Sequence, residues 1–243
     1  MAQTVTLTLF HFPTLRSRLW AFAQMGMAKS AFDVIDGVEF HKLMGTGAGA
    51  GFSTRPNFSV YAWLAVWRDV DAARDAMENA PIIQNYKSRT DETMTLYLNP
   101  IRTRGEWSSM TPFTVGDTVQ SGETVVALTR ATLRASKAPA FWSRVPAISD
   151  AVEADSHQGF MLGMGEVPYL HQVTFSVWTD EAAMRSFSLN SPTHGEAVKA
   201  AYTDGWFKEY LFARFNLVDI EGDWSRFDPS LFVPQQTAMM AAE

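Results

Sequence analysis

Apolar and polar positions alternate from Thr4 to Phe10, and the segment is rich in β-branched residues, which predicts a half-buried strand. A helix is predicted next, with an apolar face at i, i+4, i+7 and i+11 formed by Leu15, Leu19, Phe22 and Gly26. A further helix is predicted from about Val70 to Lys87. Three more strands are predicted at Val38–Leu43, Val60–Trp67 and Thr93–Leu98, the second of them buried on both faces.

The same order of elements recurs after a polar, glycine-punctuated connection from about Ser108 to Glu123. A helix is predicted at Ala138–Ala154 and a second helical region between Trp178 and Tyr210. The strands of this half are predicted at Val125–Leu133, Phe160–Met164, Gln172–Trp178 and Tyr210–Val218.

Two short motifs recur where corresponding elements end. Trp67-Arg68-Asp69 matches Trp178-Thr179-Asp180, and Gly105-Glu106-Trp107-Ser108 matches Gly222-Asp223-Trp224-Ser225. The second pair has the longer separation, which indicates an insertion in the second copy around Ser188 to Glu196. Two matches in register with one order of elements predict an internal duplication.

The predicted fold is α+β, with tandem ferredoxin-like units forming a dimeric α/β barrel within one chain. Each unit makes a four-stranded antiparallel sheet with helices on one face, so the bare apolar faces must cover each other around a cavity. We expect an N-terminal unit at 1–108, a linker at 109–123, a C-terminal unit at 124–227 and a flexible tail at 228–243. The C-terminal unit is the candidate for binding a cofactor, which the residues discussed below suggest to be haem.

The charge balance argues against a nucleic-acid partner. The chain has 243 residues, 47% of them hydrophobic, which is enough to bury a sizeable core, and its net charge is −6 with no block of Lys and Arg. The longest apolar run, Val60 to Trp67, is too short to cross a bilayer, and no signal peptide is recognised. We therefore expect a cytoplasmic protein.

The chain contains no cysteine, which excludes disulfides, thiolate-bound zinc, iron–sulfur clusters and a thiolate-ligated haem. It is rich in aromatic residues and methionine, with 8 Trp, 17 Phe and 12 Met. This content suits either a large apolar ligand or a well-filled core.

Familiar nucleotide and hydrolase motifs do not fit. The glycine run Gly45–Gly51 has the wrong spacing for a dinucleotide fingerprint and lacks the Gly-Lys-Ser/Thr of a P-loop, so it is read as a flexible hairpin or lid. None of the five histidines forms a His-Glu-x-x-His zinc pattern, and no serine lies in a Gly-x-Ser-x-Gly elbow.

His194 is the candidate metal ligand. Val198, Ala201 and Gly205 follow it at i+4, i+7 and i+11, which places its imidazole on the helix face that meets the sheet. Its counterpart in the first copy is Met77 or Ile83, so the fold itself does not require a histidine there. A hydrogen-bonded core histidine is the alternative, and without cysteine a haem iron would need His, Tyr or Met.

Three further polar residues are candidates. His171 begins a strand after Pro168-Tyr169-Leu170 and is read as a distal polar group, a second axial ligand or a plain strand-end residue. Arg130 and Arg134 are placed in a strand of the second copy, on one face with Leu128 and Thr132. If that face meets a cavity, an arginine there would bind a propionate or stabilise bound oxygen; otherwise the face is solvated.

Five segments together resemble the spheroidene monooxygenase family, the acyclic carotenoid 2-ketolases of purple photosynthetic bacteria. The resemblance runs from the first strand to about Phe227. It is carried by Leu19–Gly26, Lys42–Gly47, Ala127–Thr132, Gly165–Phe175 and Gly205–Phe207.

The resemblance implies a haem-dependent oxygenase that uses dioxygen and reduced ferredoxin to introduce a keto group at C-2 of spheroidene or a related carotenoid. By fold analogy the proximal ligand would be His194, with Arg134 at the cofactor and Arg130 and His171 in catalysis. A carotenoid substrate implies peripheral contact with the photosynthetic membrane, and a homo-oligomer is compatible with the sequence. The alternatives are a cofactor-free monooxygenase of the antibiotic-biosynthesis type and a non-catalytic carrier of haem or a lipophile.

Overall fold

The computed structural model describes residues 3–49, 53, 55–116, 124–146, 158–190 and 203–228, with side chains described except at 158 and 188–190. The first half of the chain contains four strands and four helices: β1 Thr4–His11, α1 Leu15–Met27, α2 Lys29–Asp33, β2 Val38–Gly47, β3 Pro56–Trp67, α3 Val70–Asn79, α4 Pro81–Lys87 and β4 Glu92–Gly105. The second half follows the same order: β5 Val125–Leu133, the 3-10 helix η1 Ala135–Lys137, α5 Ala138–Trp142, β6 Gln158–Gly165, β7 His171–Trp178, α7 Glu181–Asn190 and β8 Phe207–Asp223.

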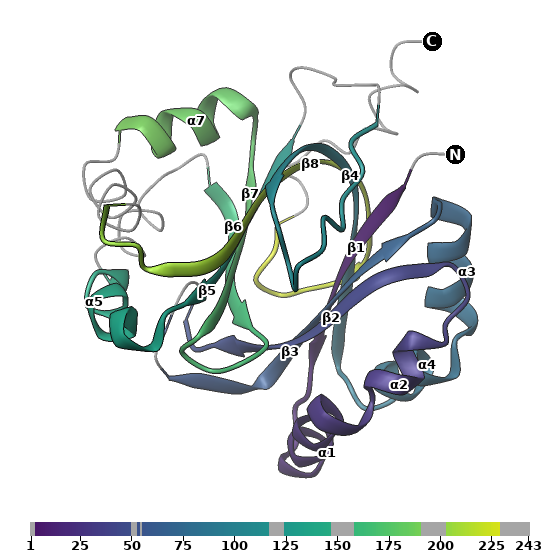
Figure 1. Ribbon diagram of the computed structural model, residues 1–243. Helices are drawn as coiled ribbons and strands as arrows, with labels where there is room; N and C mark the ends of the chain where they lie inside the picture. The colour runs from purple at the N-terminus through teal and green to yellow at the C-terminus, as the bar shows by residue number, and fades with distance from the viewer. Residues whose placement is uncertain are drawn as a thin grey trace.

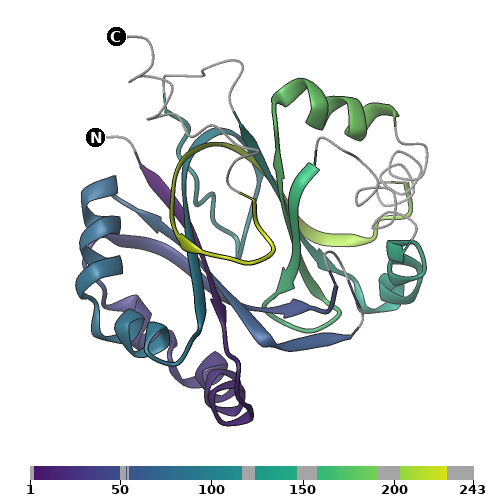
Figure 2. The same cartoon turned by 180° about the vertical axis from the view of Figure 1, so that it is seen from behind.

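The eight strands form one closed antiparallel barrel in the order β1-β3-β2-β6-β7-β5-β8-β4. Each half contributes a four-stranded sheet, and the two sheets join edge to edge at β2–β6 and at β4–β8. Helices α1 to α4 lie outside the first sheet, and α5 and α7 lie outside the second (Figures 1 and 2). The predicted α+β barrel of two ferredoxin-like units is therefore confirmed.

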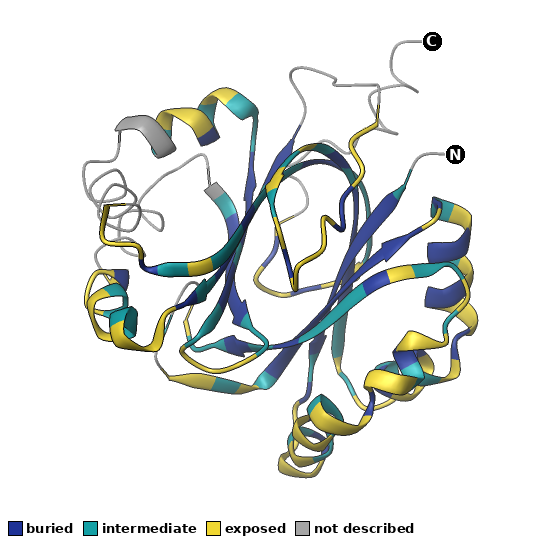
Figure 3. Cartoon of the chain, viewed as in Figure 1, coloured by how far each residue is buried: buried dark blue, intermediate teal, exposed yellow. Residues whose placement is uncertain are grey.

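The inside of the barrel is an apolar core, because alternate residues of every strand point inward. Its members are fully or almost fully buried and come from both halves, for example Leu7 on β1, Leu64 on β3, Leu128 on β5 and Phe215 on β8. Figure 3 shows that the buried residues, in dark blue, are concentrated on the strands. Closure of the barrel lets the bare faces of the two sheets cover each other.

The repeated Gly-x-Trp-Ser motif ends the last strand of each half in the same way. Gly105 and Gly222 both have positive φ, 100° and 82°, and a Cβ at either would lie 2.2 or 2.1 Å from a carbonyl oxygen of the neighbouring strand. Only glycine fits such a close backbone approach. Each turn sends the following tryptophan, Trp107 or Trp224, into the barrel core.

The apolar face predicted for α1 is wrong. Leu15, Leu19 and Phe22 are exposed, and the buried residues of this helix are Ser17 and Ala21 on the opposite side. Small side chains on that side let the helix lie close to the end of the first sheet. Hydrophobic spacing predicts a helix correctly but does not tell which face the rest of the protein covers.

Two further predictions need correction. The helix expected from Val70 to Lys87 is split into α3 and α4, because Pro81 begins α4 and holds Ala80 in an extended conformation (φ −67°, ψ 122°). The strand expected to end at Leu43 continues to Gly47, so the first part of the glycine run belongs to β2. Four predicted stretches lie outside the described residues: 50–51 of the glycine run, 117–123 of the linker, 147–154 of the helix, and the tail from 229.

Candidate functional site

The outer faces of the two sheets differ in side-chain size. On the first sheet, large side chains pack against α1 to α4 in one buried cluster that includes Phe10, Tyr61 and Trp63, with Leu43 partly buried against it. Phe32 of α2 lies 4.6 Å from Trp63 between ring centroids. This face is covered by a buried and mainly hydrophobic layer between sheet and helices.

The counterparts of these four residues on the second sheet are small or polar. Trp67 and Trp178 are equivalent in the repeat and pair with Thr4 and Val125, which fixes the alignment of the flanking strands. It matches Phe10 with Ala131, Leu43 with Gly163, Tyr61 with Gln172 and Trp63 with Thr174. We call Ala131, Gly163, Gln172 and Thr174 the small-residue face.

Solvent exposure differs in the same sense. Thr8, in the middle of the first sheet, is fully buried and lies 3.7 Å from the sulfur of Met77. Its counterpart Thr129, between β7 and β8, is exposed. Among the described residues, the outer face of the second sheet is therefore open at Thr129, whereas a residue on a strand flanked on both sides is normally covered by packing.

Aromatic residues border the small-residue face on β8. Thr129 pairs with Phe212 and Ala131 with Tyr210, and the two rings lie 5.6 Å apart between centroids. Their counterparts on β4 are Thr95 and Thr93. The second sheet has thus lost bulk over β5 to β7 and gained aromatic side chains at one margin, an arrangement suited to a flat apolar ligand lying between sheet and helices.

Arg134 is not in a strand, contrary to the prediction. β5 ends at Leu133, and Arg134 precedes η1 with its side chain exposed. Its Nε donates to the Gly205 carbonyl at 3.0 Å, and its backbone N–H donates to the Trp206 carbonyl. It lies just beyond Ala131 at the end of the small-residue face, with its terminal nitrogens unpaired among the described residues.

Arg130 points the other way, into the barrel, on one face with Leu128 as predicted. Its side chain is 2% exposed and donates through Nη1 to Glu209 on β8. The guanidinium also lies 5.8 Å from the centre of the Trp107 ring. The solvated alternative for this face is therefore wrong, and the burial of a guanidinium requires the carboxylate partner that it has.

Glu209 binds the backbone of the turn after β4 as well as the Arg130 side chain. Its carboxylate accepts the backbone N–H groups of Ser108 at 3.1 Å and Ser109 at 2.7 Å, two residues with positive φ. Burial opposes ionisation of Glu209, but these N–H groups and the Arg130 guanidinium outweigh it, so the pKa of Glu209 is lowered. Glu209 is thus a carboxylate that links β5, β8 and the turn after β4.

Glu166, directly after β6, is the second carboxylate of this group. It accepts the indole N–H of Trp107 at 2.7 Å and pairs with Lys42 of β2 at 3.0 Å, and Arg130 lies 3.8 Å away. Lys42 belongs to the first half and Glu166 to the second, so this pair spans the β2–β6 seam. We call Lys42, Trp107, Arg130, Glu166, His171 and Glu209 the barrel ion network.

His171 is the first residue of β7 and faces the barrel ion network. Its Nδ1 is buried, lies 3.9 Å from Glu166 and makes no hydrogen bond. Burial lowers the pKa of His171, the Glu166 carboxylate opposes this, and Arg130 and Lys42 add to the lowering. The imidazole is therefore held in its neutral form near Arg130, on the opposite side of the sheet from the small-residue face.

The remaining candidate, His194, lies outside the described residues. Within the described ranges, no three histidine, aspartate or glutamate side chains are grouped so that they could hold a metal ion. Sequence reasoning missed Glu166, Glu209 and Lys42. Lys42 and Glu166 do lie in segments that carry the family resemblance, which was the one available signal.

The fold defines a class: a dimeric α/β barrel formed within a single chain. Solved structures share it at low identity. An aldoxime dehydratase in complex with butyraldoxime aligns with a TM-score of 0.58 at 14% identity, covering 90% of this chain and 82% of that one. A second aldoxime dehydratase structure gives 0.55 at 13% identity, covering 89% and 82%.

Sequence comparison identifies the family. Spheroidene monooxygenase of Rhodobacter capsulatus is 41% identical over 226 residues, which are 92% of this chain and 94% of that one. The protein of the same name from Cereibacter sphaeroides is 40% identical over 93% of this chain and 70% of that one, and that from Rubrivivax gelatinosus is 31% identical over 86% and 80%. No family model matches the chain. The chain belongs to the spheroidene monooxygenase family.

The structure also bears on membrane insertion. Among the helices in the described part of the chain, none is both long and apolar enough to span a bilayer.

Proposed function

We propose that this protein is a haem-dependent monooxygenase that introduces a keto group at C-2 of spheroidene or a related acyclic carotenoid, using dioxygen and electrons from reduced ferredoxin. The relatives named spheroidene monooxygenase support the reaction and the substrate class, because they align over most of this chain and of their own length. The loss of side-chain bulk on the outer face of the second sheet is the structural observation that carries the cofactor part.

The small side chains of this face would leave room for a haem against the sheet. A porphyrin is flat and mostly apolar, so it needs a slot between two layers rather than a round cavity. The exchange of Trp63 for Thr174, and of Leu43 for Gly163, removes bulk where helices cover the first sheet. Phe212 and Tyr210 would then border the ring on β8.

The internal repeat supports His194 as the iron ligand. The counterpart of His194 is Met77 at the separation that aligns Trp107 with Trp224, and Ile83 at the separation that aligns Trp67 with Trp178. Both residues are buried in the cluster between the first sheet and its helices. The Met77 sulfur lies over the outer face of the first sheet, 3.7 Å from Thr8 and 3.9 Å from Thr95. The equivalents of these threonines on the second sheet are Thr129, which is exposed, and Phe212, which is partly exposed. An imidazole placed like Met77 would face the same region, and a neutral imidazole is a common haem ligand.

Arginine at the edge of the site suits the carboxylates of a haem. Arg134 lies at the end of β5, next to the small-residue face, and its terminal nitrogens are available to bind a propionate. Arg130 and His171 lie on the inner side of the same two strands. We assign them as positioning residues, because the barrel ion network fixes β5, β7 and β8 beneath the small-residue face.

When bound, the haem would supply the iron at which dioxygen is activated. Each hydroxylation consumes one dioxygen, two electrons and two protons, and releases one water. A second hydroxylation at the same carbon gives a geminal diol, which loses water to leave the ketone. The protein's own contribution would be to orient the polyene with apolar side chains and to exclude water.

A turnover assay tests the proposal. Purified protein supplied with haem, spheroidene in detergent, dioxygen and a ferredoxin reduction system should form the ketone, and His194→Ala should lose both the Soret band and the product. His11→Ala is the matched control, because His11 pairs with Asp91 in the first half. Product formed without haem would select a cofactor-free oxygenase, and haem binding without product would select a carrier.

A further inference from the structure

The outward face of α1 forms an exposed apolar stripe that the protein itself does not cover. Leu15, Leu19 and Phe22 are 74%, 62% and 59% exposed, and Phe58 of β3 is 52% exposed. The rings of Phe22 and Phe58 touch, with centroids 5.9 Å apart, so the stripe continues from the helix onto the sheet. We call Leu15, Leu19, Phe22 and Phe58 the α1 stripe. Exposed apolar residues are ordinary singly, but a contiguous set indicates an interaction site.

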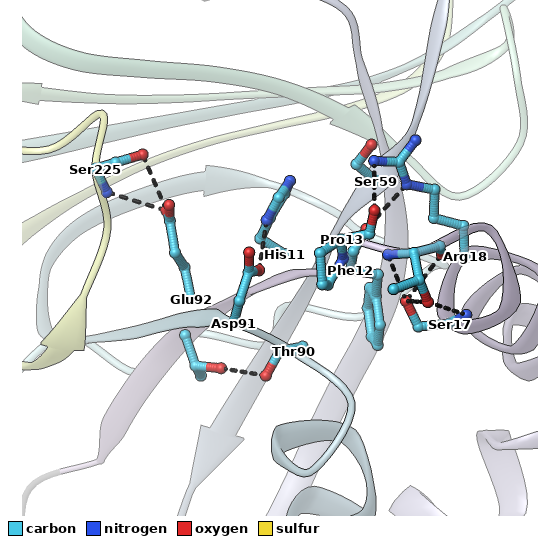
Figure 4. Close-up of polar contacts among 12 residues, drawn as sticks. His11, Phe12, Pro13, Ser17, Arg18, Ser59, Thr90, Asp91, Glu92 and Ser225 are labelled. Carbon is cyan, nitrogen blue, oxygen red and sulfur yellow. Dashed lines mark hydrogen bonds and ion pairs between the residues drawn. The ribbon is translucent and has the colours of Figure 1, made fainter.

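The orientation of α1 is fixed by polar contacts at its beginning (Figure 4). Thr14 and Ser17 form a capping box, in which each side chain accepts the backbone N–H of the other. Arg18 donates to the carbonyls of Phe12 at 2.9 Å and Pro13 at 3.0 Å. These contacts hold the helix with Ser17 and Ala21 inward, so the α1 stripe faces outward because of the fold itself.

The charged residues next to the α1 stripe in the sequence are all positive. The chain carries a net charge of −6, yet no Asp or Glu occurs from Phe12 to Ala31, a segment that contains Arg16, Arg18 and Lys29. Arg16 and Lys29 are exposed and have no ion-pair partner among the described residues. In Figure 3 the helix stands out from the end of the barrel with its outer side exposed.

Apolar side chains flanked by unpaired cations match the surface of an anionic bilayer. The apolar groups enter the boundary between headgroups and acyl chains, and the cations remain at the phosphates. A second copy of this chain is a poorer match, because a two-fold contact through this face would bring Arg16 and Lys29 of both copies together. An apolar protein groove would satisfy the leucines and phenylalanines but gives no role to the cations.

We propose that the α1 stripe, with Arg16 and Lys29, docks the protein on an anionic lipid bilayer. The proposal rests on the proposed function, because a carotene substrate dissolves in lipid and the enzyme must take it from the bilayer. The first half of the chain thus supplies the membrane contact, whereas the second half bears the small-residue face.

Vesicle flotation tests the docking surface directly. Carotenoid-free vesicles of phosphatidylcholine, with and without phosphatidylglycerol, are mixed with wild-type protein and with two double variants. Wild type should float with the anionic vesicles and lose binding as salt rises. Leu19→Asn/Phe22→Asn should weaken binding about 100-fold, about tenfold for each buried side chain. Arg16→Gln/Lys29→Gln should weaken it about 25-fold, about fivefold for each cation.

Met110→Asn is the matched control, because Met110 is a large side chain that is 50% exposed in the turn after β4. It should bind like wild type. All substituted residues are exposed, so circular dichroism should show unchanged folding. Wild type that stays with the lipid-free fraction would overturn the proposal, as would double variants that float like wild type. A wild-type dimer that Leu19→Asn/Phe22→Asn converts to a monomer, with vesicle binding unchanged, would show a self-interface instead.

The flotation assay involves no turnover, so its outcome is independent of the catalytic assay. Normal flotation by a protein that forms no ketone would contradict the proposed function alone. Ketone formation in detergent by a protein that never floats would contradict the docking surface alone.

Discussion

Replacing Arg130 with methionine should destabilise the barrel strongly, because the arginine is the centre of the barrel ion network. Its side chain is 2% exposed, pairs with Glu209 and lies 3.8 Å from Glu166. Methionine keeps much of the volume but leaves two carboxylates without their shared cation. Breaking one partner of a buried ion pair costs about 3–5 kcal/mol.

For Arg130→Met we expect the free energy of unfolding to fall by about 3 kcal/mol, the lower end of this range. Glu209 keeps the N–H groups of Ser108 and Ser109, and Glu166 keeps Lys42 and the Trp107 indole. For a protein of this size, such a loss lowers Tm by about 6–12 °C.

Urea unfolding followed by tryptophan fluorescence measures this change. Arg130→Met/Glu209→Gln should recover about 1–2 kcal/mol, because the second substitution removes the stranded charge. Arg134→Met is the matched control and should stay within about 1 kcal/mol of wild type, since Arg134 is exposed and donates one hydrogen bond from its side chain. The reasoning would be refuted if Arg130→Met and Arg134→Met were equally stable.

Two further predictions concern the pH response and the strand-end glycines. Because the pKa of His171 is lowered in the folded protein, the unfolded chain binds the proton more readily, and stability is lost as pH falls from the ordinary value of 6.5 through the folded pKa. His171→Gln should reduce this loss in unfolding curves measured across that pH range. An unchanged slope would argue against a neutral imidazole in the folded protein. Gly222→Ala should lower the free energy of unfolding in urea by about 2 kcal/mol or more, because the φ of Gly222 is 82° and a Cβ would lie 2.1 Å from the Thr93 carbonyl oxygen. Gly26→Ala is the control and should be neutral or stabilising, because a Cβ there meets nothing within 4 Å.

Much of the fold could be predicted because local patterns and the repeat agree. β5 has the predicted bounds, Val125–Leu133, and the Gly-x-Trp-Ser match marked two structurally equivalent strand ends. Arg130 shares a face with Leu128 as predicted, and the structure decides between the two alternatives by turning that face inward. These features depend on neighbours in sequence, or on comparison of the two halves.

What could not be predicted depends on contacts between distant segments. The side of α1 that is buried is decided by the capping contacts of Thr14 and Ser17 and by the sheet end that Ala21 meets, so periodicity alone chose the wrong face. The pairing of Lys42 with Glu166 exists only because the barrel closes at the β2–β6 seam. The contrast between Trp63 and Thr174 is present in the sequence, but it acquires meaning only when the sheet register aligns them.

The central claim is that the second sheet binds haem where its aromatic layer is missing, and restoring that layer tests it most directly. Thr174→Trp introduces the side chain that the first half has at Trp63, and Met110→Trp adds the same group at an exposed site. In a haem titration followed by absorption, wild type and Met110→Trp should develop a Soret band, whereas Thr174→Trp should remain folded and develop none. A Soret band of equal strength in Thr174→Trp, or none in wild type, would contradict the claim.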